Sequence, residues 1–367
     1  MSSRILAKGN EAIAEGAIRA GCQAYFGYPI TPQTELLEYM ARRMPELGRV
    51  FVQAESEVAA INMVYGAAAA GARVMTSSSS PGISLKQEGV SYLAAASLPA
   101  VIVNVMRGGP GLGNIAPAQA DYFQATKGGG HGDYRSIVLA PSSVQEAMDL
   151  TAEAFDLADR YRMPVVVLTD GIIGQMMEPV VVSEAIPQLL PKPWALTGAR
   201  GRPRNLFRSI FLQVEKLEAV NLELQKKYRL VEKEQVRWRG EELADADLAL
   251  VAYGASARVA RTAMRWARQE GRRVGLLRPL SLYPFPSAAV SDLAKQVRAF
   301  LCVEMSAGQM IEDVRLASAG QAPVYLSNRL GGVVISPEEV LAAIRRVFAG
   351  QTPVYGESAE EGSWGIG

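Results

Sequence analysis

Short apolar segments alternate with helical segments along most of this chain, and this alternation limits the fold more than any other feature. The apolar segments include "VFVQA", "AVIVNVM", "SIVLAP" and "PVVVLTD". Strands that are apolar on both faces are typical of a parallel sheet that helices cover on both sides. The sequence therefore predicts an α/β fold with parallel sheets, in which ligands bind beyond the carboxyl ends of the strands.

The alternation breaks once and then returns, which predicts two parallel-sheet domains. We expect the first at residues 1–185. The second, smaller one is expected at residues 244–350 and contains "LALVAYG" and the closing helix "PEEVLAAIRRVFAG". Residues 351–367 have no periodic pattern and are expected to form a tail.

Between these domains, residues 186–243 are rich in charge and predict a helical connecting arm, within "RNLFRSIFLQVEKLEAVNLELQKKYRLVEKEQVRW". The apolar residues of this arm are expected along one stripe. They are Phe207, Ile210, Phe211, Val214 and Leu217. Two interpretations stay open, because the stripe either packs on its own protein or binds a partner subunit.

The composition excludes several classes of partner. The chain has 38 basic and 37 acidic residues, so no net field attracts nucleic acid or an anionic membrane. The first residues lack the apolar core of a signal peptide, and no apolar run reaches the roughly 18 residues of a membrane span. Two cysteines, Cys22 and Cys302, fit a reducing cytosol. We therefore expect a soluble cytoplasmic protein that binds neither nucleic acid nor membrane.

The sequence also lacks the residues of several common active sites. Two cysteines are too few to hold an iron–sulfur cluster within this chain. A single histidine, His131, argues against a zinc site or a histidine-based triad. Neither a GxxxxGK phosphate loop nor a GxGxxG motif is present. Any demanding chemistry must come from a cofactor or a partner chain.

Two carboxylates stand where an apolar strand meets an alanine-rich helix, in "FVQAESEVAAINMVYGAAAAG". Ser56 is a candidate helix cap, and Glu57 then lies in the first turn near the positive end of the helix dipole. That structural reading accounts for one acidic residue. However, a helix that is apolar all round is buried, so Glu57 is expected to be partly buried as well. A buried carboxyl of this kind can share a proton with a heterocyclic nitrogen.

Several other candidate residues follow strand ends. "GYPITPQ" displays Tyr28 and Thr31, although it is equally a rigid turn, and "TSSSSPG" offers hydroxyls or an ordinary turn. In "MRGGPGLGNIAP", Arg107 precedes a glycine-rich loop and suits a carboxylate ligand. His131 in "KGGGHGDY" and Asp170 in "LTDG" favour structural roles. The shared position at strand ends is a stronger signal than any one motif.

Several blocks of the sequence together resemble one known family. The blocks are "GNEAIAEGAIRAGCQAYFGYPITP", "QAESEVAAINMVYGAAAAGARVMT", "SPGISLKQEG", "MRGGPGLGNIAPAQADYFQATKGGGHGDY" and "LAPSSVQEA". They look like the alpha chain of 2-oxoacid:ferredoxin oxidoreductases, with the closest resemblance to the 3-methyl-2-oxobutanoate (2-oxoisovalerate) type. Relatives that act on 2-oxoglutarate share most of these blocks. "TSSSSPG" departs from the family, because it has serine where relatives often have glycine.

The resemblance implies a thiamine diphosphate pyrimidine-binding domain at 1–185 and a transketolase C-terminal-like domain at 244–350. By motif position it places Glu57 at the aminopyrimidine nitrogen N1′, with Glu55 as a mere neighbour. It places Thr31 and Arg107 at the carboxylate of the substrate, and Pro29 in the cofactor-binding turn beside them. The further candidates are Tyr28, Ser80, Gly82 and His131.

The resemblance also implies partner chains. No GDG motif with a downstream asparagine is present to hold Mg²⁺ and the diphosphate, so a beta chain must supply both. The 4Fe–4S clusters are expected in partner chains, including gamma and ferredoxin-like chains. Coenzyme A is the co-substrate and ferredoxin the electron acceptor.

The favoured substrate is 3-methyl-2-oxobutanoate, because "GYPITP", "SSSSPGIS" and "GPGLGNIAP" contain no second cation for a second carboxylate. The alternatives are 2-oxoglutarate or pyruvate, a transketolase-like half that transfers no electrons, and a non-catalytic assembly subunit.

Overall fold

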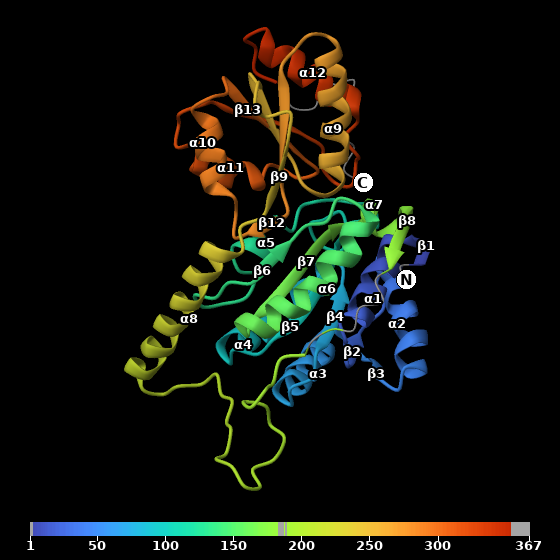
Figure 1. Cartoon of the computed structure of the whole chain (residues 1–367), viewed down its shortest axis with the longest axis vertical. Coiled ribbons are helices and arrows are strands. Elements are labelled where there is room, and N and C mark those ends of the chain that lie inside the picture. Colours follow the sequence, from blue (N-terminus) through green and yellow to red (C-terminus); the bar gives the residue numbers. More distant parts are fainter. Residues whose placement is uncertain (1–2, 183–186, 188, 354–367) are drawn as a thin grey trace.

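Two larger sheets, each covered by helices, form the two halves of the molecule (Figure 1). The computed structural model describes residues 3–182, 187 and 189–353. The first sheet has seven strands in the order β12-β6-β7-β5-β4-β2-β3. Its strands are β2 (Ala24–Gly27), β3 (Val50–Gln53), β4 (Val74–Ser78), β5 (Ala100–Met106), β6 (Ile137–Leu139), β7 (Pro164–Asp170) and β12 (Ser281–Tyr283). All pairs are parallel except β6 with β12.

Helices cover both faces of this sheet, as the fully buried strands β5 and β7 require. α3 packs on α4, whereas α1 packs on α2 and α6. Right-handed crossovers put α3 and α4 on the face opposite α2 and α6. The helices are α1 (Gly9–Arg19), α2 (Thr34–Glu46), α3 (Glu57–Ala69), α4 (Ser80–Ala95), α5 (Tyr122–Thr126), α6 (Val144–Tyr161) and α7 (Gly171–Gln175).

The strand order reverses between β2 and β4. From β2 the chain moves outward to β3, and then it returns across β2 to β4 and on to β5. Such a switch point opens a crevice at the carboxyl ends of the strands, where ligands of open α/β sheets bind. The turns after β2, β3, β4 and β5 therefore converge at this edge.

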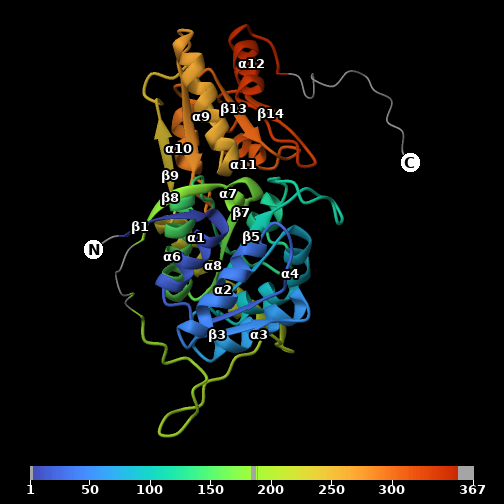
Figure 2. The ribbon, with the colours of Figure 1, turned by 90° about the vertical axis from the view of Figure 1, so that its right-hand side faces the viewer.

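The second sheet has five strands in the order β14-β13-β10-β11-β9. α9 packs on α12, and α10 packs on α11 (Figure 2). The strands are β9 (Trp238–Glu241), β10 (Leu248–Val251), β11 (Val274–Pro279), β13 (Ala299–Glu304) and β14 (Val324–Asn328). The helices are α9 (Gly254–Gln269), α10 (Ser287–Ala294), α11 (Met310–Ser318) and α12 (Pro337–Phe348). These mainly parallel sheets confirm the predicted α/β class.

Three antiparallel features go beyond that prediction. β9 pairs antiparallel with β11, and β12 joins the first sheet although it follows β11 in the chain. β1 (Ser3–Lys8) pairs with β8 (Met177–Val182) in a separate ribbon. β1 runs directly into α1, so Asn10 lies inside the helix, where its side chain donates to the carbonyl of Pro32 at 2.7 Å.

The connecting arm is helical over a shorter stretch than expected. α8 (Val214–Glu234) begins at Val214, and residues 204–213 are not helical. The predicted stripe does not lie along one helix, because Phe207, Ile210 and Phe211 precede α8. Ile210 and Val214 are 71% and 75% exposed, so they do not pack on this chain, and the interpretation as a partner surface stays a prediction. The helix packs instead through Leu224, Tyr228 and Val231, which follow helical spacing later in the arm.

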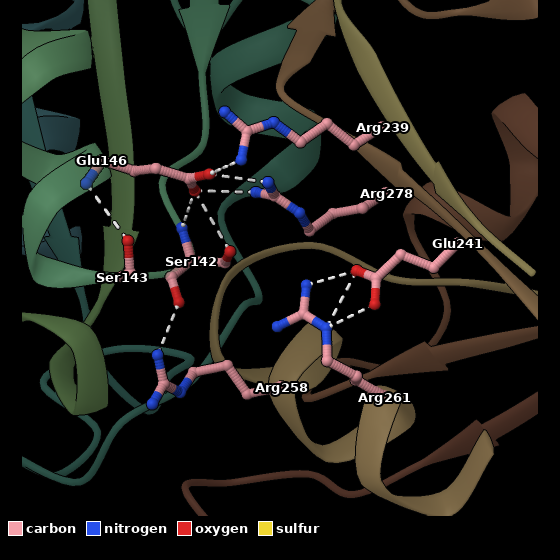
Figure 3. Close-up of polar contacts among 8 residues, drawn as sticks. All are labelled: Ser142, Ser143, Glu146, Arg239, Glu241, Arg258, Arg261 and Arg278. Carbon is pink, nitrogen blue, oxygen red and sulfur yellow. Dashed lines mark hydrogen bonds and ion pairs between the residues drawn. The ribbon is translucent and has the colours of Figure 1, made fainter. Parts of the chain in front are cut away.

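Polar contacts join the two halves near the start of α6 (Figure 3). Glu146 accepts two hydrogen bonds from Arg278 of β11, at 2.8 and 2.7 Å, and lies 3.1 Å from Arg239 of β9. Arg258 of α9 donates to the carbonyl of Ser142 at 3.1 Å. Because Arg278 is almost fully buried, loss of Glu146 would leave a buried cation without its hydrogen-bonded partner.

No helix in the described part of the chain has both the length and the apolar character needed to cross a membrane.

Candidate active site

Glu57 is buried at the start of α3, where the sequence predicted it. Ser56 caps the helix, because its Oγ accepts a hydrogen bond from the amide of Ala59 at 3.1 Å. The Glu57 side chain is only 4% exposed. Within the described residues its carboxyl accepts one hydrogen bond, from Ser78 Oγ to Oε1 at 3.3 Å. This long single bond leaves most of the hydrogen-bonding capacity of the carboxyl available to a ligand.

Gly82 is packed directly against this carboxyl, in the first turn of α4. A Cβ atom at Gly82 would lie 2.3 Å from Glu57 Oε1 and 2.1 Å from Ser78 Oγ. Real side chains do not approach so closely, so only glycine fits here while the carboxyl keeps its place. The serine-rich turn thus forms one wall of the Glu57 site.

Arg107 follows β5 and is held by the backbone of two loops. Its Nη1 donates to the carbonyl of Thr31 at 3.0 Å, and its Nη2 donates to the carbonyl of Leu112 at 3.0 Å. The residue is 8% exposed, and its buried Nε has no partner among the described residues. The structure therefore brings Thr31 and Arg107 together, through the Thr31 carbonyl rather than its exposed side chain.

Ser80 links Arg107 to a buried polar network that sequence reasoning missed. Ser80 Oγ accepts from the amide of Arg107 at 3.0 Å and donates to Asp121 Oδ2 at 2.6 Å. Asn104 donates to the same Asp121 oxygen at 2.9 Å, and burial raises the pKa of Asp121. The signal for Asn104 was its polar side chain within the apolar strand "AVIVNVM".

Other predicted residues lie at the rim or farther away. Tyr28 and Pro29 are exposed in the turn after β2, and Glu55 is exposed. His131 is also exposed, and its Nδ1 lies 3.4 Å from Ser91 Oγ on α4. Ser91 is about 16 Å along α4 from Ser80, at 1.5 Å per residue. His131 is therefore remote from the Glu57 carboxyl.

Asp170 has the structural position that its sequence context favoured. Its Oδ1 accepts from the amide of Ile173 at 3.0 Å and so caps α7, while Oδ2 accepts from Ala255 of α9 at 2.8 Å. Burial raises the pKa of Asp170. Gln119 also joins the halves, because its Nε2 donates to the carbonyl of Tyr253 at 3.0 Å. These bonds fix the second half against the carboxyl end of β7.

A large hollow of the molecule lies away from these residues. It has a volume of about 690 Å³ and lies between the loop around Asp133 and the start of α8. None of the candidate site residues described in this section lines this hollow. The chemistry of the side chains, rather than cavity size, identifies the Glu57 site as the candidate active site.

Comparison with known families assigns both halves of the chain. Residues 15–242 match the family described as "Pyruvate flavodoxin/ferredoxin oxidoreductase, thiamine diP-bdg". Residues 246–340 match "Pyruvate:ferredoxin oxidoreductase core domain II". The first match alone covers more than half of the chain. The chain thus belongs to a class of oxidoreductases with a thiamine-diphosphate-binding domain.

Two relatives from one organism identify the type of subunit. The "Ketoisovalerate oxidoreductase subunit VorB" of Methanothermobacter thermautotrophicus is 58% identical, over 93% of this chain and 97% of the relative. The "2-oxoglutarate synthase subunit KorA" of the same organism is 38% identical, over 95% of this chain and 100% of the relative. The chain therefore belongs to the 2-oxoacid:ferredoxin oxidoreductases, as an alpha-type subunit. This confirms the family expected from the sequence.

Solved structures show the same fold. The 2-oxoglutarate:ferredoxin oxidoreductase of Magnetococcus marinus matches with a TM-score of 0.84 and 27% identity over 93% of this chain. The present chain spans only 65% of that longer chain. A split-gene transketolase, described as an inactive beta4 tetramer, matches with a TM-score of 0.58 and 13% identity, over 93% of this chain and 97% of that chain. The second match concerns the fold alone.

Proposed function

We propose that this alpha-type subunit holds the aminopyrimidine half of thiamine diphosphate for the oxidative decarboxylation of a 2-oxoacid. The products are an acyl-CoA and electrons for ferredoxin. One observation carries the proposal: Glu57 is buried beside Gly82 at the switch point of the sheet, and its carboxyl accepts one long hydrogen bond in the described structure. The buried Ser79 Oγ and Arg107 Nε, without partners in the described residues, also suit a bound polar ligand.

Each residue has a defined task in this proposal. When bound, thiamine diphosphate supplies the electron sink for decarboxylation. The Glu57 carboxyl holds a proton at a ring nitrogen, and Ser78 orients Oε1 through its hydroxyl. Gly82 keeps the space beside the carboxyl open. Arg107, fixed by the Thr31 carbonyl, directs its remaining N–H groups to the carboxylate of the substrate.

Partner chains complete the proposed site. No group of acidic, histidine or cysteine residues that could hold a metal occurs in the described ranges. Apolar side chains are nevertheless exposed beside the site, at Val58, Leu85, Leu112 and Ile115. A beta chain that covers them would supply the Mg²⁺ and diphosphate ligands. We expect the 4Fe–4S clusters in partner chains such as gamma and ferredoxin-like chains. We also expect a cytoplasmic complex, as the buried and unpaired Cys22 and Cys302 suggest.

The site favours 3-methyl-2-oxobutanoate over 2-oxoglutarate. A second substrate carboxylate would need a second cation, because an unpaired buried charge is costly. Lys86 is fully buried with its Nζ bonded inside the protein, and Lys127 forms an ion pair with Asp313. The higher identity to the ketoisovalerate oxidoreductase subunit also supports the branched substrate.

The test is an assay of the purified complex with a panel of 2-oxoacids, coenzyme A and a viologen dye. We expect kcat/KM for 3-methyl-2-oxobutanoate to exceed that for 2-oxoglutarate and pyruvate. A higher value for 2-oxoglutarate would overturn the substrate assignment and place a second cation in a partner chain. Absence of dye reduction with every 2-oxoacid would favour a transketolase-like or assembly role.

A further inference from the structure

Lys86 is buried in α4 on the helix face that packs against α3. It is 0% exposed. Four residues earlier, Gly82 contacts the Glu57 carboxyl, and three residues later a Cβ atom at Gly89 would lie 2.6 Å from Ile61 of α3. Residues at this spacing share one face of a helix. Lys86 therefore lies between two close contacts of α4 with α3.

The ammonium group of Lys86 is bonded to the strand that orients Glu57. Its Nζ donates to Thr76 Oγ1 at 2.7 Å and to the carbonyl of Ser77 at 2.8 Å. The next residue, Ser78, donates from its hydroxyl to Glu57 Oε1 at 3.3 Å. One short stretch of β4 thus connects the buried cation to the buried carboxyl.

Lys86 and Glu57 carry opposite charges in the same buried region. Burial lowers the pKa of Lys86 to about 7, and the charge of Glu57 acts in the opposite direction. The side chain is therefore mainly an ammonium ion below pH 7, where carboxyl groups titrate. A buried carboxylate is unfavourable without a compensating charge, and the interaction of the Lys86 ammonium group with Glu57 has the sign that compensates it.

The other titratable groups around Glu57 do not provide this charge. Tyr25 of β2 bonds to Ser77 Oγ at 2.6 Å, and burial raises its pKa, so it stays neutral. Asp121 bonds to Ser80 and is itself an acid, so it cannot supply a positive charge. Arg107 is held by the loop carbonyls of Thr31 and Leu112, and the function proposed above assigns its charge to the substrate carboxylate.

We propose that Lys86 is a positioning residue for the reaction: its ammonium group fixes the end of β4 and compensates the charge of the Glu57 carboxylate. The proposal rests on the function proposed above for Glu57. It assigns Lys86 no contact with substrate or cofactor, because the side chain is enclosed by the protein.

The first experiment is the pH profile of Lys86→Met in the purified complex. Methionine has a similar length and no charge. We expect the acid limb of the kcat/KM profile to move upward by about one pH unit, as loss of a nearby opposite charge predicts. Thr76→Val is the matched control, since it removes one acceptor but keeps the ammonium group, and its acid limb should not move. A Lys86→Met complex that loses activity equally at every pH would overturn the proposal.

The second experiment needs no cofactor. Denaturant unfolding of the full chain at pH 6 is compared for Lys86→Met, Glu57→Gln and the double variant. We expect the double variant to be more stable than the two single changes predict together, by about tenfold in the unfolding equilibrium constant. If Lys86→Met alone does not fold, addition of Glu57→Gln should restore folding. Additive effects, or failure of this rescue, would overturn the charge pairing.

The two experiments separate this inference from the proposed function. If the Glu57→Gln complex is fully active, the function proposed for Glu57 is wrong. The positioning role of Lys86 is then wrong as well, even if the unfolding cycle is non-additive. If the Glu57→Gln complex is inactive but the unfolding cycle is additive, the function proposed for Glu57 stands and only the role proposed for Lys86 is overturned.

Discussion

At the scale of single residues, the two neighbouring glutamates are distinguished by their surroundings. Glu57 is buried beside Ser78 and Gly82, whereas Glu55 is exposed two residues earlier. A carboxyl contributes to proton transfer when its surroundings hold it within hydrogen-bond reach of the reacting group, and only Glu57 is enclosed in this way. The difference is testable because both residues have the same side chain.

We expect Glu57→Gln to lower the turnover of the assembled complex at least about a hundredfold, the lower end of what one positioned proton-transfer group contributes. Glu55→Gln is the matched control and should cost far less. Steady-state rates with the preferred 2-oxoacid and a viologen dye measure both. The assignment fails if Glu55→Gln proves the more damaging change.

Arg107 should act on the carboxylate of the substrate. Arg107→Ala removes a charged donor and is expected to raise KM for the 2-oxoacid about 10- to 100-fold, and poor positioning should also lower kcat. Arg107→Lys keeps the charge but loses the fork that bonds Thr31 and Leu112, so an intermediate effect is expected. Unchanged 2-oxoacid kinetics with altered affinity for coenzyme A would contradict this role.

At the scale of elements, the close approach of α4 to Glu57 depends on one glycine. Gly82→Ala should displace either the carboxyl or the first turn of α4, because the new methyl group would overlap both Glu57 and Ser78. We expect at least about a tenfold loss of turnover, in line with the effect of misplacing a catalytic group.

Gly66→Ala, on α3, is the matched control for this change. A Cβ atom there meets nothing within 4 Å, and alanine is favoured over glycine within a helix. This variant should keep full activity and gain slightly in thermal stability. Equal losses in both variants would show that the contact at Gly82 has no special importance.

The sequence predicted elements well where burial dictates the pattern. Strands such as β5 are apolar on both faces, and Ser56 caps α3 as expected, because both signals are local. The start of α8 and the pairing of β12 were missed, since charged and short segments carry weak patterns and depend on distant partners. The boundaries of the predicted domains, at residues 185 and 243, stay predictions.

For the candidate site, too, the sequence predicted the residues that local patterns indicate and missed those that depend on long-range contacts. Glu57, Ser80 and Arg107 follow β3, β4 and β5, which run parallel, so the topology alone brings them to one edge of the sheet. Asn104 and Asp121 were missed, because their roles depend on how a loop folds back over β5. The catalytic and binding roles of all these residues stay predictions until they are measured.

At the scale of the whole molecule, the proposed function divides the cofactor site between this chain and a partner chain. The described residues contain no cluster of side chains that could hold a metal. We therefore expect the isolated chain to be inactive and to bind thiamine diphosphate weakly, with little dependence on Mg²⁺. Calorimetric titration with and without Mg²⁺ measures this directly. Tight, Mg²⁺-dependent binding by the chain alone would contradict the proposed division of the site between subunits.

β12 follows strands of the second sheet in the chain but pairs in the first sheet, and this affects the order in which the protein can fold during synthesis. Six strands of the first sheet have been synthesised by residue 170, but the seventh, β12, follows only after β10 and β11 of the second sheet. Until then β6 is an edge strand with unpaired backbone groups, which can pair with other chains. A nascent or truncated chain that ends before residue 281 therefore exposes this edge. The first half completes its sheet only after the ribosome has produced β9, β10 and β11 of the second half.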